Sequence, residues 1–191
     1  MKELGLGIMI NSFSLKSWPP DKHFKEVCCA LDNGAFNCYR KGYPFQADVF
    51  FDMIKHCYKL GIVLDFIVCP DIMCAGEKSF QYSMEWAKGE LLSTPNLALV
   101  VQDGMEPKGI KFDIEDYFTH IFVGGSVDWK WKTAKEWVKF SHDNNMKCHI
   151  GQCGQLEFLK LAHEYNADSV DSSSIVRNGS WDIINQFRGG I

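Results

Sequence analysis

Four aspartates in this sequence follow short apolar stretches and could carry chemistry on a bound ligand. Asp32, Asp71 and Asp171 come directly after such stretches, and Asp103 follows another one after Gln102. A carboxylate in this place adds nothing to a core and can act as an acid, a base or a nucleophile. Each aspartate alone also has a structural interpretation, because aspartate caps helices and forms turns. Asp32 precedes the next helical pattern by about 14 residues, which disfavours capping there.

The elements that position these aspartates alternate along the chain. The apolar stretches are continuous, as in parallel strands that are buried on both faces. Strands are predicted over 4–10, 27–31, 64–69, 97–101, 121–123, 146–150 and 169–171. Helices are predicted over 46–60, 80–92, 133–144, 156–165 and 181–187, with a weaker helical turn over 113–118.

Seven strand-helix units predict one α/β domain over residues 1–191, a compact or incomplete (β/α) barrel of TIM type. A doubly wound open sheet is the alternative. No Gly-x-Gly-x-x-Gly motif follows the first strand and no phosphate loop is present, which disfavours a nucleotide cofactor. In a parallel barrel, the catalytic groups sit at the carboxyl ends of the strands, where the aspartates stand.

Composition limits the classes of protein. Hydrophobic residues make up 46% of the 191 residues, enough for a core, and the net charge of -4 gives no overall attraction to nucleic acid. No apolar run reaches the ~18–20 residues of a membrane span, and the first residues lack the pattern of a signal peptide. The eight cysteines are therefore expected to be reduced thiols of a cytoplasmic protein.

Neither a metal nor a cofactor is expected. The pair Cys69 and Cys74 and the pair Cys148 and Cys153 are each five residues apart, which is not the spacing of a zinc knuckle. No close Asp-x-Asp or His-x-His pair supports a magnesium site, and no Gly-x-Ser-x-Gly motif supports serine hydrolysis. His149 lies inside a predicted strand and is either a packed core residue or a site group.

Glycines, aromatic residues and cations are also expected near the strand ends. Gly124 and Gly125 would leave a flat slot for a ligand. Aromatic residues that could stack on a planar ring are Phe36, Tyr39, Phe45, Trp129 and Trp131. The cations of these loops are Arg40, Lys41, Lys130, Lys132 and Arg177. Such a basic, aromatic rim suits a nucleic acid with one base turned into a pocket, and the alternatives are loop packing and solvated charges.

The strand-end segments resemble one family in their order along the chain. The segments are 31–36, 68–72, 101–104, 122–126 and 168–172, which read LDNGAF, VCPDI, VQDG, FVGGS and DSVDS. This series resembles the tRNA-guanine transglycosylase superfamily. It looks closest to its small phage members of the queuine tRNA-ribosyltransferase type and is related to the DNA-acting 7-deazaguanine transglycosylases.

The resemblance implies a role for each matching residue. Asp171 would be the nucleophile and Asp32 the acid-base group, while Asp71 and Gln102 would bind the edge of the base. Gly124 and Gly125 would line the base slot. The expected base-binding set is completed by Asp103, Phe36 and Gln152. The family's Cys/His zinc subdomain is missing, so DNA is expected rather than tRNA.

The expected function is displacement of a base by cleavage of its N-glycosidic bond, with nucleic acid and a free nucleobase as partners and no membrane. A carboxylate near the anomeric carbon stabilises or captures the positive sugar, and a second acid assists the departing base. One alternative is a glycosylase that hydrolyses a modified phage base and leaves an abasic site. An alternative from another class is an inactive barrel that binds a nucleotide or a protein partner.

Overall fold

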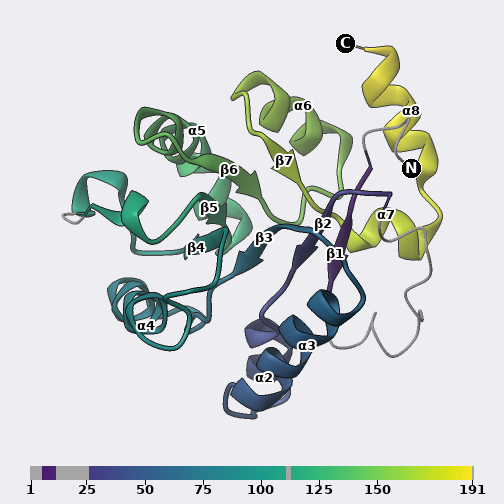
Figure 1. Cartoon of the computed structure of the whole chain (residues 1–191). Coiled ribbons are helices and arrows are strands. Elements are labelled where there is room, and N and C mark those ends of the chain that lie inside the picture. Colours follow the sequence, from purple (N-terminus) through teal and green to yellow (C-terminus); the bar gives the residue numbers. More distant parts are fainter. Residues whose placement is uncertain (1–5, 12–25, 111–112, 191) are drawn as a thin grey trace.

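Seven parallel strands in sequence order form one curled sheet in the computed structural model, which describes residues 6–11, 26–110 and 113–190 (Figure 1). The strands are β1 (Ile8–Ile10), β2 (Cys29–Leu31), β3 (Leu64–Val68), β4 (Leu97–Val101), β5 (His120–Val123), β6 (Lys147–Ile150) and β7 (Ser169–Val170). The sheet is a half-barrel, and the prediction of an incomplete TIM-type α/β barrel is confirmed. The unbroken order β1 to β7 has no switch point, so the doubly wound alternative is wrong. Residues 4–5 of the predicted first strand lie outside the described residues.

The helices lie around the curled sheet (Figure 1). They are α2 (Ala35–Arg40), α3 (Ala47–Lys59), α4 (Glu77–Lys88), α5 (Val127–Asp143), α6 (Leu156–Glu164), α7 (Ser173–Asn178) and α8 (Trp181–Gly189). Two 3-10 turns, η3 (Pro107–Gly109) and η4 (Ile114–Asp116), lie between β4 and β5. Sequence patterns missed α2, α7 and η3. None of the helices in the described ranges has the length and apolar character needed to cross a membrane.

Helix α5 begins at Val127, not at Thr133 as predicted. The alternation of tryptophan and lysine over 129–132 hides the helical spacing of this first turn. Ser126 in front of the helix and Asp128 in its first turn are the helix-start signals that could have revealed it. The correction matters because it moves residues 129–132 from a loop onto a helix.

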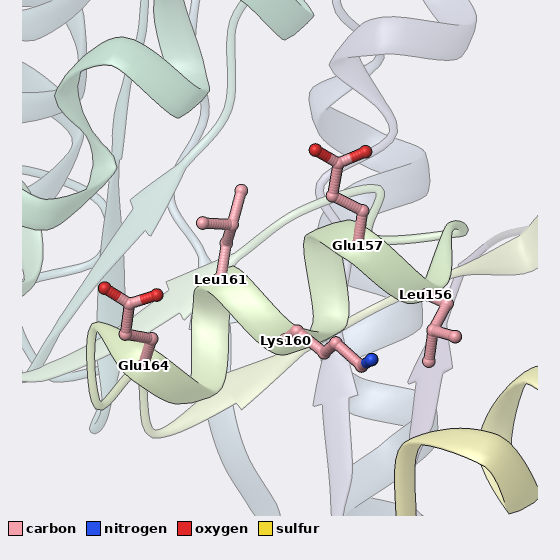
Figure 2. Close-up of a pocket in the computed structure, with 5 residues that line it drawn as sticks. All are labelled: Leu156, Glu157, Lys160, Leu161 and Glu164. Atoms are coloured by element: carbon pink, nitrogen blue, oxygen red, sulfur yellow. The ribbon is translucent and has the colours of Figure 1, made fainter. Parts of the chain in front are cut away.

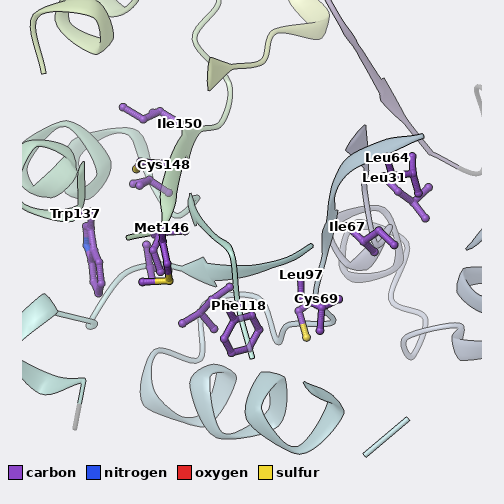
Figure 3. Close-up of a cluster of buried hydrophobic side chains, with 14 of the residues drawn as sticks. Leu31, Leu64, Ile67, Cys69, Leu97, Phe118, Trp137, Met146, Cys148 and Ile150 are labelled. Carbon is purple, nitrogen blue, oxygen red and sulfur yellow. The ribbon is translucent and has the colours of Figure 1, made fainter. Parts of the chain in front are cut away.

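The two faces of the sheet bury different residues, because successive side chains of a strand point to opposite sides. The outer face packs against the helices in the main core, which includes Leu31, Leu97, Cys148 and Trp137 (Figure 3). The inner face carries a smaller cluster of Ala30, Phe66, Val68, Ala98 and Val100, with Met9 and Phe122 packed against it. All eight cysteines of the chain are free thiols.

The same alternation determines which strand-end residues face the inside of the curl. Ala30 lies on the inner face, so Asp32 two residues later is on the same side. Phe122 packs against the inner cluster and is followed at the same spacing by Gly124. Ser169 holds the ring of His149 inside the curl, which places Asp171 there as well. The carboxyl ends of parallel strands meet at one edge, where these residues form the candidate site.

Candidate active site

Asp32 and Asp171 follow β2 and β7, which have four strands between them in the sheet order. The curl of the sheet brings the two carboxylates near each other. Burial is the main cause that raises the pKa of Asp32, and the charge of Asp171 raises it further. The Gly34 amide donates to Asp32 Oδ1 over 3.2 Å and lowers this pKa, without compensating for burial. Asp32 is thus biased toward its protonated form.

Asp171 is biased toward the ionised form. Burial alone would raise its pKa, but hydrogen-bond donors and positive charge outweigh burial and hold the pKa below its ordinary value. His149 Nε2 lies 3.2 Å from Asp171 Oδ1, and the Gln152 amide donates to the same oxygen over 3.1 Å. The Lys130 ammonium adds a weaker attraction. The pKa values of the two aspartates are therefore shifted in opposite directions, so one carboxyl binds its proton more tightly than the other.

His149 has a fixed orientation beneath Asp171. Its Nδ1 lies 2.8 Å from Ser169 Oγ, so Nε2 is turned toward the carboxylate. The ring centroid is 4.7 Å from that of Phe122 and 5.1 Å from that of Phe66, and the side chain is buried. From the sequence, His149 could be either a packed core residue or a site group. In the structure it packs against aromatic rings and also lies within hydrogen-bond distance of Asp171. The alignment of β6 with β7, which pairs His149 with Ser169, is a tertiary feature.

Lys130 is buried inside the protein and does not belong to an exposed basic rim. Its side chain is 1% exposed, and its ammonium donates to the carbonyl oxygen of Gly151 over 2.5 Å. Burial lowers the pKa of Lys130, while electrostatic interactions with Cys153, Asp171 and Asp103 oppose this shift. The prediction of an exposed lysine was wrong because α5 starts early and turns this side chain under the strand ends. A buried cation is costly unless it has partners, and here the Gly151 carbonyl accepts its hydrogen bond while Asp171 and Asp103 stabilise its charge.

Asp71 lies at the end of β3 in a buried polar network. Asn33 Nδ2 donates to Asp71 Oδ1 over 2.9 Å and to the carbonyl oxygen of Cys69 over 2.7 Å. Burial raises the pKa of Asp71 to about 6, the Asn33 hydrogen bond opposes the shift, and the charge of Asp32 adds to it. Asn33 was not among the residues predicted for the site, although its place directly after Asp32 was a signal.

Gln102 is fully occupied by protein groups. Its Nε2 donates to Ser79 Oγ over 2.8 Å and to the Ile72 carbonyl over 3.0 Å, and it lies 3.4 Å from Asp71 Oδ2. Its Oε1 accepts from the Cys74 amide over 2.6 Å. With 1% of the residue exposed and both amide hydrogens used, Gln102 holds the loop after β3 and does not present a free amide to a base.

Asp103 also has protein partners instead of facing an open slot. Its Oδ2 accepts from the Ser126 amide over 2.7 Å, and its Oδ1 accepts from the Ser126 hydroxyl over 2.5 Å. Burial would raise the pKa of Asp103, but these hydrogen bonds outweigh it and lower the pKa. The carboxylate thus holds the turn that leads into α5.

Three glycines allow close packing at the strand ends. A Cβ atom on Gly125 would lie 2.5 Å from Asp103 Oδ2, and the residue has a φ of +74°. A Cβ atom on Gly151 would lie 2.9 Å from the Phe122 ring, and one on Gly124 would lie 3.3 Å from a Val100 methyl. Gly125 and Gly151 therefore cannot carry a side chain without rearrangement.

Gln152 contributes its backbone to the site. Its φ of +62° is uncommon for a residue other than glycine. This conformation accompanies the hydrogen bond from its amide to Asp171, while the residue as a whole is exposed. Gln152 was predicted to bind the base. The contact that the structure shows is the hydrogen bond from its backbone amide to the Asp171 carboxylate.

The predicted rim divides into packed and exposed residues. Trp129 packs on the core, Trp131 stacks on Phe158 with centroids 4.7 Å apart, and Phe45 packs against Phe50 and Trp86. These three aromatic side chains belong to helix packing because the first turn of α5 and the start of α3 face the core. The exposed members of the rim are Phe36, Tyr39, Arg40, Lys41, Lys132 and Arg177.

Two further features of the described chain, a surface hollow and the placement of possible metal ligands, lie outside the strand-end site. A surface hollow of about 470 Å³ is lined by five residues of α6 alone, and it contains none of the strand-end residues (Figure 2). Within the described ranges, no group of three or more histidine, cysteine or acidic residues is arranged to hold a metal ion.

No protein-family model matches the chain, and a comparison with curated proteins finds no match.

Proposed function

We propose that this protein displaces a nucleobase by cleaving its N-glycosidic bond, with DNA as the substrate and the target base turned out of the strand. The observation that carries the proposal is the pair Asp32 and Asp171, which lie at the strand ends with pKa values shifted in opposite directions, the charge of Asp171 contributing to the shift of Asp32. Two carboxylates with separated protonation states are what cleavage of a bond to an anomeric carbon uses.

The proposed reaction begins with loss of the base. The bond from the anomeric carbon to the base nitrogen breaks, its electron pair goes to the base, and Asp32 supplies the proton that neutralises the base. An oxygen of Asp171 forms a bond to the anomeric carbon. The hydrogen bonds from His149 and Gln152 keep Asp171 ionised until that bond forms.

The second half of the reaction releases the sugar from Asp171. An incoming base, or a water molecule, attacks the anomeric carbon and gives its proton to Asp32, while the bond to Asp171 breaks. Entry of a base completes an exchange, and entry of water leaves an abasic site. Both outcomes use the same two carboxylates.

Among the other strand-end residues, Phe36 suits the recognition of a planar base. Phe36 is 42% exposed and lies four residues after Asp32, and the ring face opposite Arg40 can stack on a base. Asp71 is 6% exposed and accepts a hydrogen bond from Asn33, so it supports the segment that carries Asp32 instead of presenting a free edge to the base. Gly124 and Gly125 have no side chains, and Val100 and Asp103 pack closely against them at this strand end.

The test is mass spectrometry of bases released from tRNA, unmodified DNA and modified phage DNA, with and without added 7-deazaguanines. Release with uptake of the added base supports exchange, and release without uptake supports the glycosylase. Asp171→Asn is the control, because base release that depends on the candidate site should be lost in this variant. If no substrate releases a base, the proposal is rejected in favour of a binding protein.

A further inference from the structure

Helix α2 and the turn after it expose aromatic rings and positive charges together. Phe36, Tyr39 and Tyr43 are 42%, 58% and 59% exposed, and Arg40 and Lys41 are exposed between the two tyrosines. Single exposed aromatic residues are ordinary on protein surfaces. Three within eight residues, beside two cations, indicate a surface for a partner that is both flat and anionic.

The end of α2 holds this surface rigid. The amide of Tyr43 donates to the carbonyl of Cys38 over 2.9 Å, and the amide of Gly42 donates to that of Tyr39 over 3.0 Å. Gly42 has a φ of +68°, which completes the Schellman ending of a helix. In that motif the residue after the glycine commonly packs against the helix, but Tyr43 stays exposed. The backbone of Tyr43 is therefore held in place, while its exposed ring does not pack into the core.

The beginning of α2 is tied to the candidate active site. The Ala35 amide donates to Asn33 Oδ1 over 2.8 Å, and Asn33 Nδ2 donates in turn to Asp71. The Gly34 amide donates to Asp32. In Figure 1, α2 is the first helix after β2. A strand whose target base lies at Asp32 would therefore pass along α2 with its neighbouring nucleotides.

The charge of this surface is positive. No aspartate or glutamate occurs between Asn33 and Ala47, although the chain as a whole has a net charge of -4. Arg40 lies over the Phe36 ring at 5.8 Å from its centroid, and within the described ranges neither Arg40 nor Lys41 has a carboxylate partner. Exposed aromatic rings with adjacent cations are the combination that binds single-stranded nucleic acid, through stacked bases and neutralised phosphates.

We propose that α2 and its turn bind the single-stranded segment next to the target nucleotide. Tyr39 and Tyr43 stack on unpaired bases, and Arg40 and Lys41 contact the phosphates. The location of the target nucleotide rests on the proposed function, whereas binding of single strands to this surface does not require catalysis. Stacking on unpaired bases also disfavours an intact duplex at this surface.

The test measures binding of the full chain to fluorescently labelled single-stranded DNA, RNA and duplex of mixed sequence by anisotropy. Tyr39→Ala and Tyr43→Ala should each weaken single-strand binding about tenfold. The matched control is Tyr58→Ala, because Tyr58 is 48% exposed near the end of α3, on the side where β3 begins. The double change Arg40→Gln with Lys41→Gln should reduce the slope of log K against log salt by about 1.4.

The controls separate this surface from general electrostatics and from the proposed activity. Lys55→Gln with Lys59→Gln removes two cations from α3 and should leave the salt slope nearly unchanged. Equal effects at α2 and α3, preference for duplex, or no single-strand binding would overturn the proposal. Single-strand binding through α2 without base release would reject the proposed activity alone. If Tyr39→Ala and Tyr43→Ala change neither base release nor single-strand binding, the proposed binding surface alone is rejected.

Discussion

Replacing Asp71 by asparagine should remove a pH-dependent loss of stability. Asp71 is 6% exposed, and burial together with the charge of Asp32 disfavours its ionised form in the folded protein. In the unfolded chain the carboxyl ionises at its ordinary pKa. The folded protein therefore binds this proton more tightly, and the stability present below the unfolded pKa is lost as pH rises through the folded pKa.

The size of the effect follows from the two pKa values. The pKa rises from 3.8 to about 6 on folding. A shift of about 2 units at ~1.4 kcal/mol per unit corresponds to about 3 kcal/mol of unfolding free energy. Roughly 2 kcal/mol of this falls between about pH 4.5 and about pH 7.5, where Asp71 ionises in the folded protein. Asparagine cannot ionise, so the variant lacks this component.

The assay is urea denaturation of the wild type and Asp71→Asn at several pH values. The stability of the variant relative to the wild type should rise by about 2 kcal/mol over that range. Taking the difference cancels the titration of groups that both proteins share. The exposed Asp52→Asn is the control and should show a flat difference. A flat difference for Asp71→Asn as well would refute the assignment of a buried, proton-binding carboxyl at this strand end.

The remaining predictions concern the proposed reaction and the groups around Asp171. Asp171→Asn should abolish base release while leaving the melting temperature and nucleic-acid binding near those of the wild type, and surviving release would reject its role as nucleophile. Base release should fall as pH rises through the raised pKa of Asp32, and Asp32→Asn, which cannot supply the proton, should release far less base at every pH; release near the wild-type rate would reject its role. His149→Phe keeps an aromatic ring but removes the hydrogen bond to Asp171, so the acid limb of the pH-rate profile should move to higher pH. Lys130→Met should change unfolding free energy by less than about 2 kcal/mol, because lost desolvation cost offsets the lost hydrogen bond, while also moving the acid limb upward.

Much of the architecture could be predicted from local pattern. Continuous apolar runs and the helical spacing between them are enough to identify a parallel α/β sheet, and β4 falls on the predicted residues 97–101. The acids at the strand ends could be found in the same way, because polar residues interrupt each run. A helix as short as α2, with six residues, is too short to show the hydrophobic spacing by which longer helices are recognised.

The partners of the site residues depend on contacts between distant segments. His149 and Asp171 are 22 residues apart, and Asp71 and Gln102 are 31 apart. The pairing of β6 with β7 brings the first two together, and the end of β4 brings Gln102 beside the loop after β3. No local pattern distinguishes a glutamine that reads a base from one whose amide is already occupied.

By itself the sequence determined that acids stand at the ends of buried parallel strands, since hydrophobic periodicity and chain order are local properties. Only the tertiary structure decided in which direction the pKa of each aspartate is shifted. The pKa of Asp32 is raised because the residue is buried with the charge of Asp171 nearby, and the pKa of Asp171 is lowered because His149 and the turned amide of Gln152 reach it. Lys130 changes from a surface cation to a buried one because α5 starts early. The electrostatic character of a carboxylate is a sum over neighbours, and those neighbours meet only when the sheet curls.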